Sequence, residues 1–149
     1  MLPDAILKIG MDAAYAEAAA GLAEGGIPIG AALMRGEEIV GRGRNQRVQR
    51  GSPILHGEMS CFENAGRRND YGELVLFTTL SPCMMCSGSI VQFGVGTVVI
   101  GDTQNFGGNE DFLRERGVTV IVRKDPRCVE TMRRFIADNP EVWNEDISV

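Results

Sequence analysis

The stretch LVLFTTLSPCMMC, residues 74–86, decides how this chain folds, because it joins a strand to the start of a helix. Residues 74–79 are apolar or β-branched, a composition typical of a buried strand. Residues 83–93 have a helical composition, and Cys83 and Cys86 lie in their first turn. Two cysteines three positions apart at a helix start point their sulfur atoms the same way, and the helix N-terminus favours their thiolate forms. The stretch therefore predicts a strand, a helix and a pair of metal ligands or redox thiols.

Helices and strands alternate on either side of this unit. We expect the other helices over residues 3–24, 56–67, 111–116 and 126–138, and the other strands over residues 29–34, 38–43, 97–100 and 118–122. The first two strands form a hairpin, residues 45–53 form a polar loop, and the acidic tail 140–149 carries the only tryptophan, Trp143. This pattern predicts an α/β fold in which helices cover a mixed sheet. Because no linker composition interrupts it, residues 1–149 are expected to form a single domain.

The overall charge of the chain limits its partners. The 149 residues carry a net charge of −5, which disfavours nucleic acid as a partner, because polyanions are bound through clustered Lys and Arg. One basic stretch, containing Arg42, Arg44, Arg47 and Arg50, has two interpretations: a phosphate-binding patch, or a strand and loop whose charges face water. The acidic balance of the whole chain favours the second interpretation.

Neither export nor a membrane location is indicated by the sequence. Residues 1–4 lack the basic region of a signal peptide, and no apolar stretch approaches the roughly 20 residues that a membrane helix needs. We therefore expect a cytoplasmic protein with no membrane partner. In that compartment, metal binding or redox chemistry explains the four cysteines better than structural disulfides do.

The only histidine of the chain, His56, completes a candidate metal site with Cys83 and Cys86. Two thiolates and one imidazole are suitable zinc ligands, and three protein ligands leave the fourth position to water, which is typical of a catalytic site. Zinc lowers the pKa of that water towards neutrality. Glu58 lies two residues after His56 and is not needed as a ligand, so it is available to move protons.

Two other interpretations of the same residues remain open. A redox pair formed by Cys83 and Cys86 would give a reversible disulfide and no bound zinc. A non-enzymatic zinc module would need a fourth protein ligand, which only Cys61 or Cys128 offers among the cysteines. Neither of these lies in a metal motif, and both are expected to be buried as small hydrophobic side chains. Glu58, next to the ligand histidine, favours catalysis.

The motif HGE at residues 56–58 followed by PCMMC at residues 82–86 is the signature of zinc-dependent deaminases. With these motifs, the chain resembles the cytidine deaminase superfamily, and most closely its fungal-type cytosine deaminases, from about Gly10 to Asp146. The resemblance is also carried by GGIPIG at residues 25–30, GRGRN at 41–45, LHGE at 55–58, TTLSPC at 78–83, Asn105-Phe106 and WNED at 143–146. It implies a three-layer α/β/α sandwich with a five-stranded mixed sheet, and a homodimer.

The resemblance also implies a role for each site residue. His56, Cys83 and Cys86 would bind one Zn²⁺ with water as the fourth ligand, and Glu58 would be the proton shuttle. Asn45 and the backbone N–H of Gly57 would hold the edge of a pyrimidine ring and its carbonyl. Phe106 and Trp143 would wall the pocket, and Asp146 would accept a hydrogen bond from the base.

The implied reaction is the deamination of free cytosine to uracil. A carboxylate at Asp146 favours the free base, because a nucleoside carries its sugar where the base has an N1–H donor. Arg44 replaces a histidine of the family and Asn144 replaces an aromatic residue, so isocytosine, guanine or another aminated heterocycle remain alternative substrates. A tRNA adenosine deaminase would need a basic groove for a flipped nucleotide, which the acidic composition argues against.

Overall fold

A five-stranded sheet forms the centre of the computed structural model, which describes residues 2–149. The strands are β1 (Gly30–Arg35), β2 (Glu38–Arg44), β3 (Val75–Thr78), β4 (Thr97–Ile100) and β5 (Thr119–Val122), in the order β2-β1-β3-β4-β5. Strand β1 pairs antiparallel with both β2 and β3, whereas β3, β4 and β5 are parallel. The sheet is therefore mixed, as predicted.

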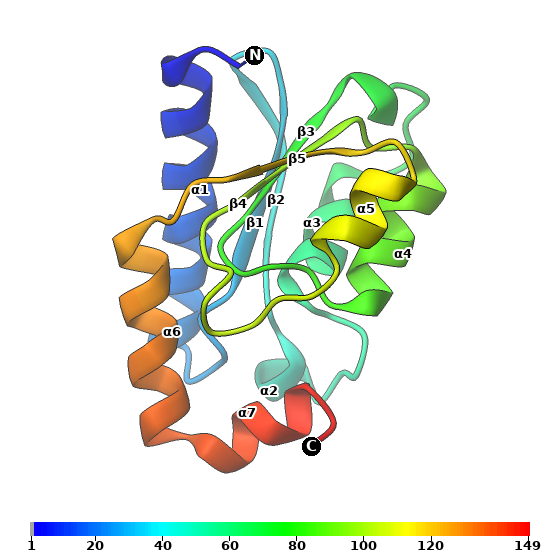
Figure 1. Cartoon of the computed structure of the whole chain (residues 1–149). Coiled ribbons are helices and arrows are strands. Elements are labelled where there is room, and N and C mark those ends of the chain that lie inside the picture. The colour runs from blue at the N-terminus through cyan, green and yellow to red at the C-terminus, as the bar shows by residue number, and fades with distance from the viewer. Residues whose placement is uncertain (1) are drawn as a thin grey trace.

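Helices cover both faces of the sheet, which confirms the three-layer arrangement (Figure 1). One layer holds α1 (Asp4–Ala23) and α6 (Pro126–Asp138), and the other holds α3 (Gly57–Ala65), α4 (Met84–Phe93) and α5 (Glu110–Glu115). Two short helices, α2 (Arg47–Arg50) and α7 (Pro140–Asp146), lie together at one end, and a 3₁₀ turn spans Tyr71–Glu73. Among the described residues, no helix is long and apolar enough to cross a membrane.

The core has one apolar layer on each side of the sheet. Leu76 packs with Ile90 and Phe62 under α3 and α4, whereas the next residue, Phe77, packs with Met11 under α1. All of β3 is buried because a strand covered on both faces has no polar side. Helix α1 approaches this strand closely at Gly10, where an added Cβ would lie 2.2 Å from the Phe77 ring.

A third apolar cluster anchors the C-terminal segment. Trp143 of α7 is only 5% exposed and packs with Ile29, Leu80 and Phe135, which come from strand ends and α6.

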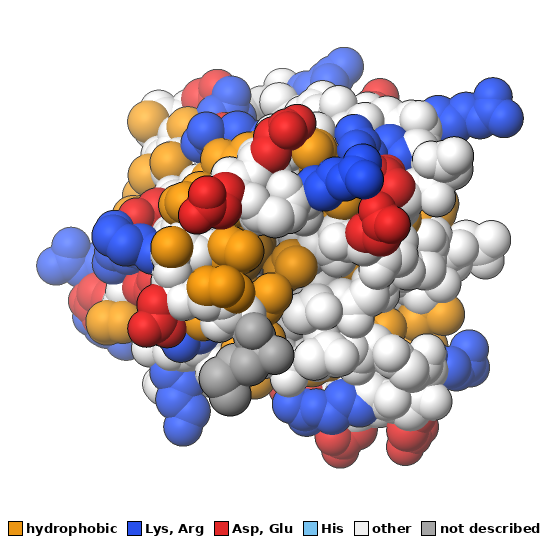
Figure 2. Space-filling model, turned by 90° about the horizontal axis from the view of Figure 1, so that it is seen from above, with side chains coloured by type: hydrophobic (Ala, Val, Ile, Leu, Met, Phe, Trp, Pro, Cys, Tyr) orange, Lys and Arg blue, Asp and Glu red, His pale blue; other side chains and the backbone are white. Residues whose placement is uncertain are grey.

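The end of the molecule opposite α7 has a surface of mixed charge. Seen from above in Figure 2, it presents basic and acidic side chains interspersed with apolar atoms, rather than one field of positive charge.

Candidate active site and metal centre

The carboxyl ends of three strands place the candidate site. Strand β2 runs parallel to β3, because both are antiparallel to β1, and β4 is parallel to β3, so all three end at the same edge of the sheet. Asn45 directly follows β2, Cys83 follows β3 after a short loop, and Phe106 lies in the loop after β4. Sites in α/β proteins gather at this edge, where helices begin.

Two of the three metal-ligand candidates are residues at which helices begin. His56 is the N-cap of α3, and Cys83 is the N-cap of α4. The Cys86 backbone N–H donates to Cys83 Sγ at 3.5 Å, so Cys83 satisfies one of the free amides of the first turn. Both helix N-termini thus point towards the ligand cluster, where their partial positive charge stabilises thiolates.

The ligand atoms of His56, Cys83 and Cys86 fit a zinc ion. They lie within 4.8 Å of one another, and Cys83 Sγ is 3.4 Å from His56 Nδ1. Ligand atoms around tetrahedral zinc, with bond lengths of about 2.0–2.3 Å, are separated by about 3.5–3.8 Å, so only small adjustments are needed. Hydrogen bonding with Cys86, and then with His56, lowers the pKa of the Cys83 thiol to about 4, so a thiolate is present at neutral pH.

The two remaining cysteines do not add a fourth ligand to this cluster. Among residues 2–149, the group of metal-binding side chains contains His56, Cys83 and Cys86 alone. Cys61 and Cys128 are buried in the apolar layers on opposite sides of the sheet, as expected. Burial raises the pKa of both thiols, that of Cys128 to about 12. Three protein ligands with an open fourth position match a catalytic zinc site rather than a structural one.

Glu58 lies beside the ligand cluster, in the first turn of α3. Its side chain is buried and lines the same pocket as His56 and Cys83. Burial, together with the negative charge of Cys83, raises the pKa of its carboxyl group to about 7. A carboxyl group with a pKa near neutrality exchanges protons readily in both directions. The environment of Glu58 therefore suits a group that both accepts and donates a proton.

Apolar side chains from several elements close the pocket above the metal cluster. Phe106 and Trp143 meet edge to face, with ring centroids 6.1 Å apart, and Ile29, Leu80 and Ile147 complete the apolar wall. The cavity measures about 20 Å³, which is room for about one water molecule. Trp143 and Asp146 of α7 contribute to its lining, so this helix narrows the site.

Two buried polar side chains lie on the other side: Asp146 lines the pocket, whereas Asn45, which is not among the described lining residues, contacts Asp146. The Asn45 residue is fully buried, and the Asp146 side chain is 4% exposed. The Asn45 Nδ2 and His56 Nε2 atoms lie 3.5 Å and 3.7 Å from Asp146 Oδ1. Gly57 is packed against β1 so tightly that an added Cβ would lie 3.1 Å from the Ile29 carbonyl oxygen. All the site residues expected from the sequence therefore come together at one edge of the sheet.

The basic stretch makes ion pairs rather than a phosphate-binding patch. Arg42 and Arg44 reach the carboxylates Glu17 and Glu24 on α1, at 3.2–3.7 Å. Neither Arg44 nor the exposed Asn144 is among the described residues that line the pocket. The two departures from the family pattern thus lie outside the pocket wall.

Two residues were not assigned to the site from the sequence: Asp102 was not named, and Arg47 was named only as part of the basic stretch. Arg47 contacts Asp146, and the fully buried Asp102 binds the loop that leads to Phe106, because its carboxylate accepts hydrogen bonds from Gln104 N and from the backbone and side-chain amides of Asn105. In the sequence, Asp102 is distinguished only by its position just after a strand. The neighbours of Arg47 in the sequence do not indicate its contact with Asp146, because the two residues are distant in the chain.

Known proteins similar to this chain share its motifs and its fold. Residues 6–102 match the cytidine and deoxycytidylate deaminase zinc-binding region. A cytosine deaminase of Candida albicans is 46% identical over 143 residues, which cover 94% of this chain and 95% of that protein. A tRNA-specific adenosine deaminase of Streptococcus pyogenes is 37% identical over 108 residues, covering 70% of this chain and 68% of that protein.

The fold itself recurs in a more distant solved structure. A guanine deaminase from Nitrosomonas europaea superposes with a TM-score of 0.74 at 20% identity, covering 92% of this chain and 94% of that one. The matched region contains all three zinc ligands and Glu58, arranged as a catalytic zinc site requires. The chain belongs to the cytidine and deoxycytidylate deaminase family of zinc-dependent enzymes.

Proposed function

We propose that this enzyme hydrolyses free cytosine to uracil and ammonia. The observation that carries the proposal is the buried Asp146 carboxylate in the wall of the zinc pocket. A free pyrimidine offers an N1–H donor to such an acceptor, whereas a nucleoside carries its sugar at N1 and offers no donor there. The similar Candida albicans protein, a cytosine deaminase, supports the same substrate.

The reaction divides into a metal role and a proton role. His56, Cys83 and Cys86 would hold zinc, which would supply Lewis-acid activation of water. Glu58 takes one proton from the attacking water, whose oxygen bonds to C4, and delivers it to the ring nitrogen N3. It then carries the remaining proton of that oxygen to the exocyclic amine, so the C4–N bond breaks, ammonia leaves and C4 keeps the oxygen as a carbonyl. Asn45 and the Gly57 N–H bind the ring carbonyl, and Phe106 and Trp143 wall the pocket against the ring.

Substrate entry requires the pocket to open. The cavity of about 20 Å³ is too small for a pyrimidine ring. Helix α7 carries the pocket-lining residues Trp143 and Asp146, and the lining residue Ile147 directly follows it, so a movement of this one short helix both widens the cavity and exposes it. Closure after binding then excludes bulk water from the reacting atoms.

Ammonia release from a panel of amines tests the substrate. The zinc-loaded protein is incubated with cytosine, isocytosine, guanine, cytidine and adenosine. Fast release from cytosine alone is the expected result. Efficient turnover of cytidine would contradict the free-base proposal, and release only from isocytosine or guanine would keep the zinc chemistry but change the substrate.

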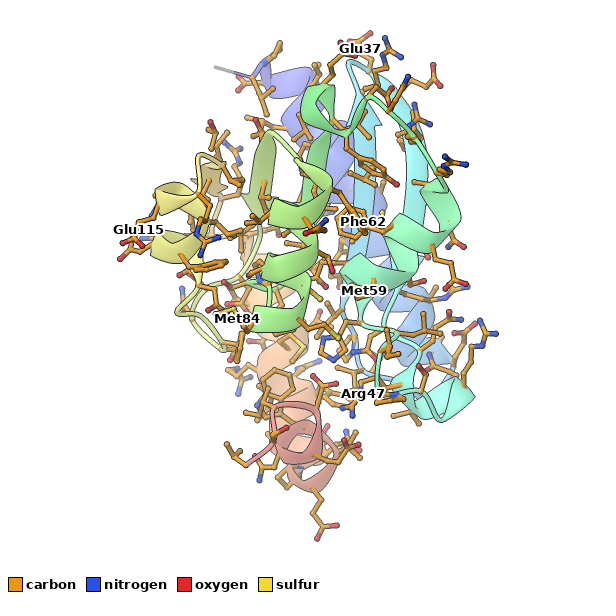
Figure 3. All side chains as sticks on the ribbon, turned by 90° about the vertical axis from the view of Figure 1, so that its right-hand side faces the viewer. Glu37, Arg47, Met59, Phe62, Met84 and Glu115 are labelled. Carbon is orange, nitrogen blue, oxygen red and sulfur yellow. The ribbon has the colours of Figure 1, made fainter. Side chains whose placement is uncertain are left out.

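We also propose that two copies of this chain associate through the outer face of α3 and α4. This face has a groove of about 490 Å³ lined by Ile54, Leu55, Met59, Phe62, Tyr71 and Phe93 among others, and Met84 and Met85 are also exposed on α4. Figure 3 looks onto it, with Met59, Phe62 and Met84 labelled. A groove with exposed apolar side chains beside it is a feature of protein–protein interaction sites. The homodimer implied by the family resemblance fits this face.

The cellular setting follows from the same chemistry. We propose that residues 1–149 act as a single deaminase domain in the cytoplasm, in pyrimidine salvage. All four cysteines are free thiols, and a reducing compartment preserves thiolates as zinc ligands. The acidic chain and its paired arginines also support a small base, rather than nucleic acid, as the partner.

A further inference from the structure

Arg47 joins two parts of the site that lie 99 residues apart in the sequence. Its Nη1 atom donates to Asp146 Oδ1 at 2.9 Å, and its Nη2 atom donates to Glu145 Oε2 at 2.6 Å. The arginine is the first residue of α2, and both carboxylates belong to α7. Figure 1 shows these two helices next to each other at one end of the molecule, and Figure 3 shows the labelled Arg47 beside α7.

The two ion pairs of Arg47 differ in their exposure to water. The Arg47 and Asp146 side chains are 14% and 4% exposed, whereas that of Glu145 is 68% exposed. Water screens the outer pair, which therefore contributes little. The inner pair is a charge-assisted hydrogen bond that water screens poorly, so it holds the two side chains in a fixed relative orientation. Without the guanidinium, Asp146 would be a buried carboxylate lacking its cationic partner, which favours conformations of α7 that expose it to water.

The backbone of the same residue orients Asn45. The Arg47 N–H donates to Asn45 Oδ1 at 3.0 Å, which fixes the direction of the side-chain amide. Because the oxygen is engaged, Nδ2 is the atom presented towards Asp146 Oδ1, at 3.5 Å. Asn45 thus places a donor beside the acceptor that Asp146 presents to the pocket. This pair is complementary to a ring carbonyl next to a ring N–H, the C2=O and N1–H edge of a free pyrimidine.

We propose that Arg47 is a positioning residue that sets the substrate-binding wall and fastens α7 over the pocket. Its guanidinium holds the Asp146 carboxylate, and its backbone N–H holds the Asn45 amide. Like Asn45, Arg47 is not among the described residues that line the pocket, so it acts on the pocket through Asp146 and through the orientation of Asn45. The inference rests on the proposed function for its substrate, whereas the closure of α7 is independent of which base is bound.

The test combines steady-state kinetics on cytosine with hydrogen exchange of the substrate-free enzyme. Arg47→Gln removes the charge but keeps the backbone N–H, so Asn45 stays oriented while Asp146 loses its partner. We expect the KM for cytosine to rise at least about tenfold, with a smaller fall in kcat and unchanged zinc content. Amide exchange in residues 140–149 should accelerate at least about tenfold. Arg47→Lys, which keeps the charge without the forked geometry, should give intermediate values.

The matched control is Arg50→Gln, which removes an exposed arginine from the same helix and should behave as wild type. A wild-type KM in Arg47→Gln would overturn the positioning role, and wild-type exchange would overturn the fastening of α7. If Arg47→Gln fails to fold, Arg47→Lys and Asp146→Asn replace it. Faster amide exchange in both variants would support the fastening of α7 by Arg47, and unchanged exchange in them would overturn it. A wild-type enzyme that releases no ammonia from cytosine would refute cytosine as the substrate. Hydrogen exchange of residues 140–149 would still show whether Arg47 fastens α7.

Discussion

Hydrogen bonding and burial shift the pKa values of two neighbouring side chains at the zinc centre in opposite directions. Hydrogen bonds lower the pKa of Cys83 to about 4, so this residue is a thiolate at neutral pH. Burial has the opposite effect on Glu58, whose pKa rises to about 7. One group therefore stays charged to hold the metal, and the other changes its protonation state during the reaction.

Replacing Glu58 with glutamine should separate metal binding from turnover. The amide has the same shape but takes up no proton, so we expect ammonia release to fall by about 10²–10⁴-fold or more. Zinc content, measured by elemental analysis, should stay at one ion per chain because Glu58 is not a ligand. A variant that retains nearly the wild-type rate would refute the proton-shuttle role.

Removing the metal should abolish activity reversibly. We expect a chelator to eliminate ammonia release and added Zn²⁺ to restore it, because His56, Cys83 and Cys86 offer a three-ligand site that exchanges with solution. Thiol titration of the metal-free protein under reducing conditions checks that both cysteines are still reduced. Activity that survives complete zinc removal would contradict the metal mechanism, and loss of activity only through a Cys83–Cys86 disulfide would favour the redox interpretation.

Single residues of the site differed in how far the sequence revealed them. His56, Glu58 and the cysteine pair were found from spacing alone, because a metal site needs fixed positions at helix starts. Asn45, Phe106 and Asp146 follow different strands or lie in α7, and only the family resemblance pointed to them. Neither the spacing nor the resemblance assigned Arg47 to the site, because its contact with Asp146 joins two segments that only folding brings together.

At the level of secondary structure, the predicted strands and long helices agree with the structure to within a few residues. The helix expected over 56–67 spans Gly57–Ala65, because His56 is its cap and Gly66 ends it. Helices α2 and α7 were not predicted. Isolated helices of four and seven residues are unstable in water, and α7 forms because Trp143 is buried in a tertiary cluster.

The packing of α1 on β3 predicts opposite effects for two helical glycines. Gly10→Ala should lower the free energy of unfolding by about 1–3 kcal/mol, because the new Cβ would collide with the Phe77 ring. Gly88→Ala in α4, where no atom lies within 4 Å of the added Cβ, should raise it by up to about 1 kcal/mol. Urea unfolding followed by circular dichroism measures both. Equal effects at the two positions would mean that the close approach at Gly10 does not matter.

At the level of the whole molecule, association through the α3–α4 face predicts a change in mass. Ile54 is 54% exposed and lines the groove on this face. Glutamate at this position would be hydrated in a monomer, but an interface would bury its charge. We expect Ile54→Glu to shift the protein from dimer to monomer in sedimentation velocity. Leu22→Glu, at a residue of α1 that is 44% exposed, is the control and should leave the mass unchanged. A monomeric wild-type protein would rule out the homodimer.

The order in which the chain is synthesised has a consequence for α7. His56, Cys83 and Cys86 leave the ribosome well before residue 146, so a nascent chain possesses a complete set of metal ligands while one wall of its pocket does not yet exist. Zinc capture can therefore precede the ability to select a base. A chain interrupted after α6 would be a metal protein without an enclosed cavity, its reactive centre open to water and to unselected solutes.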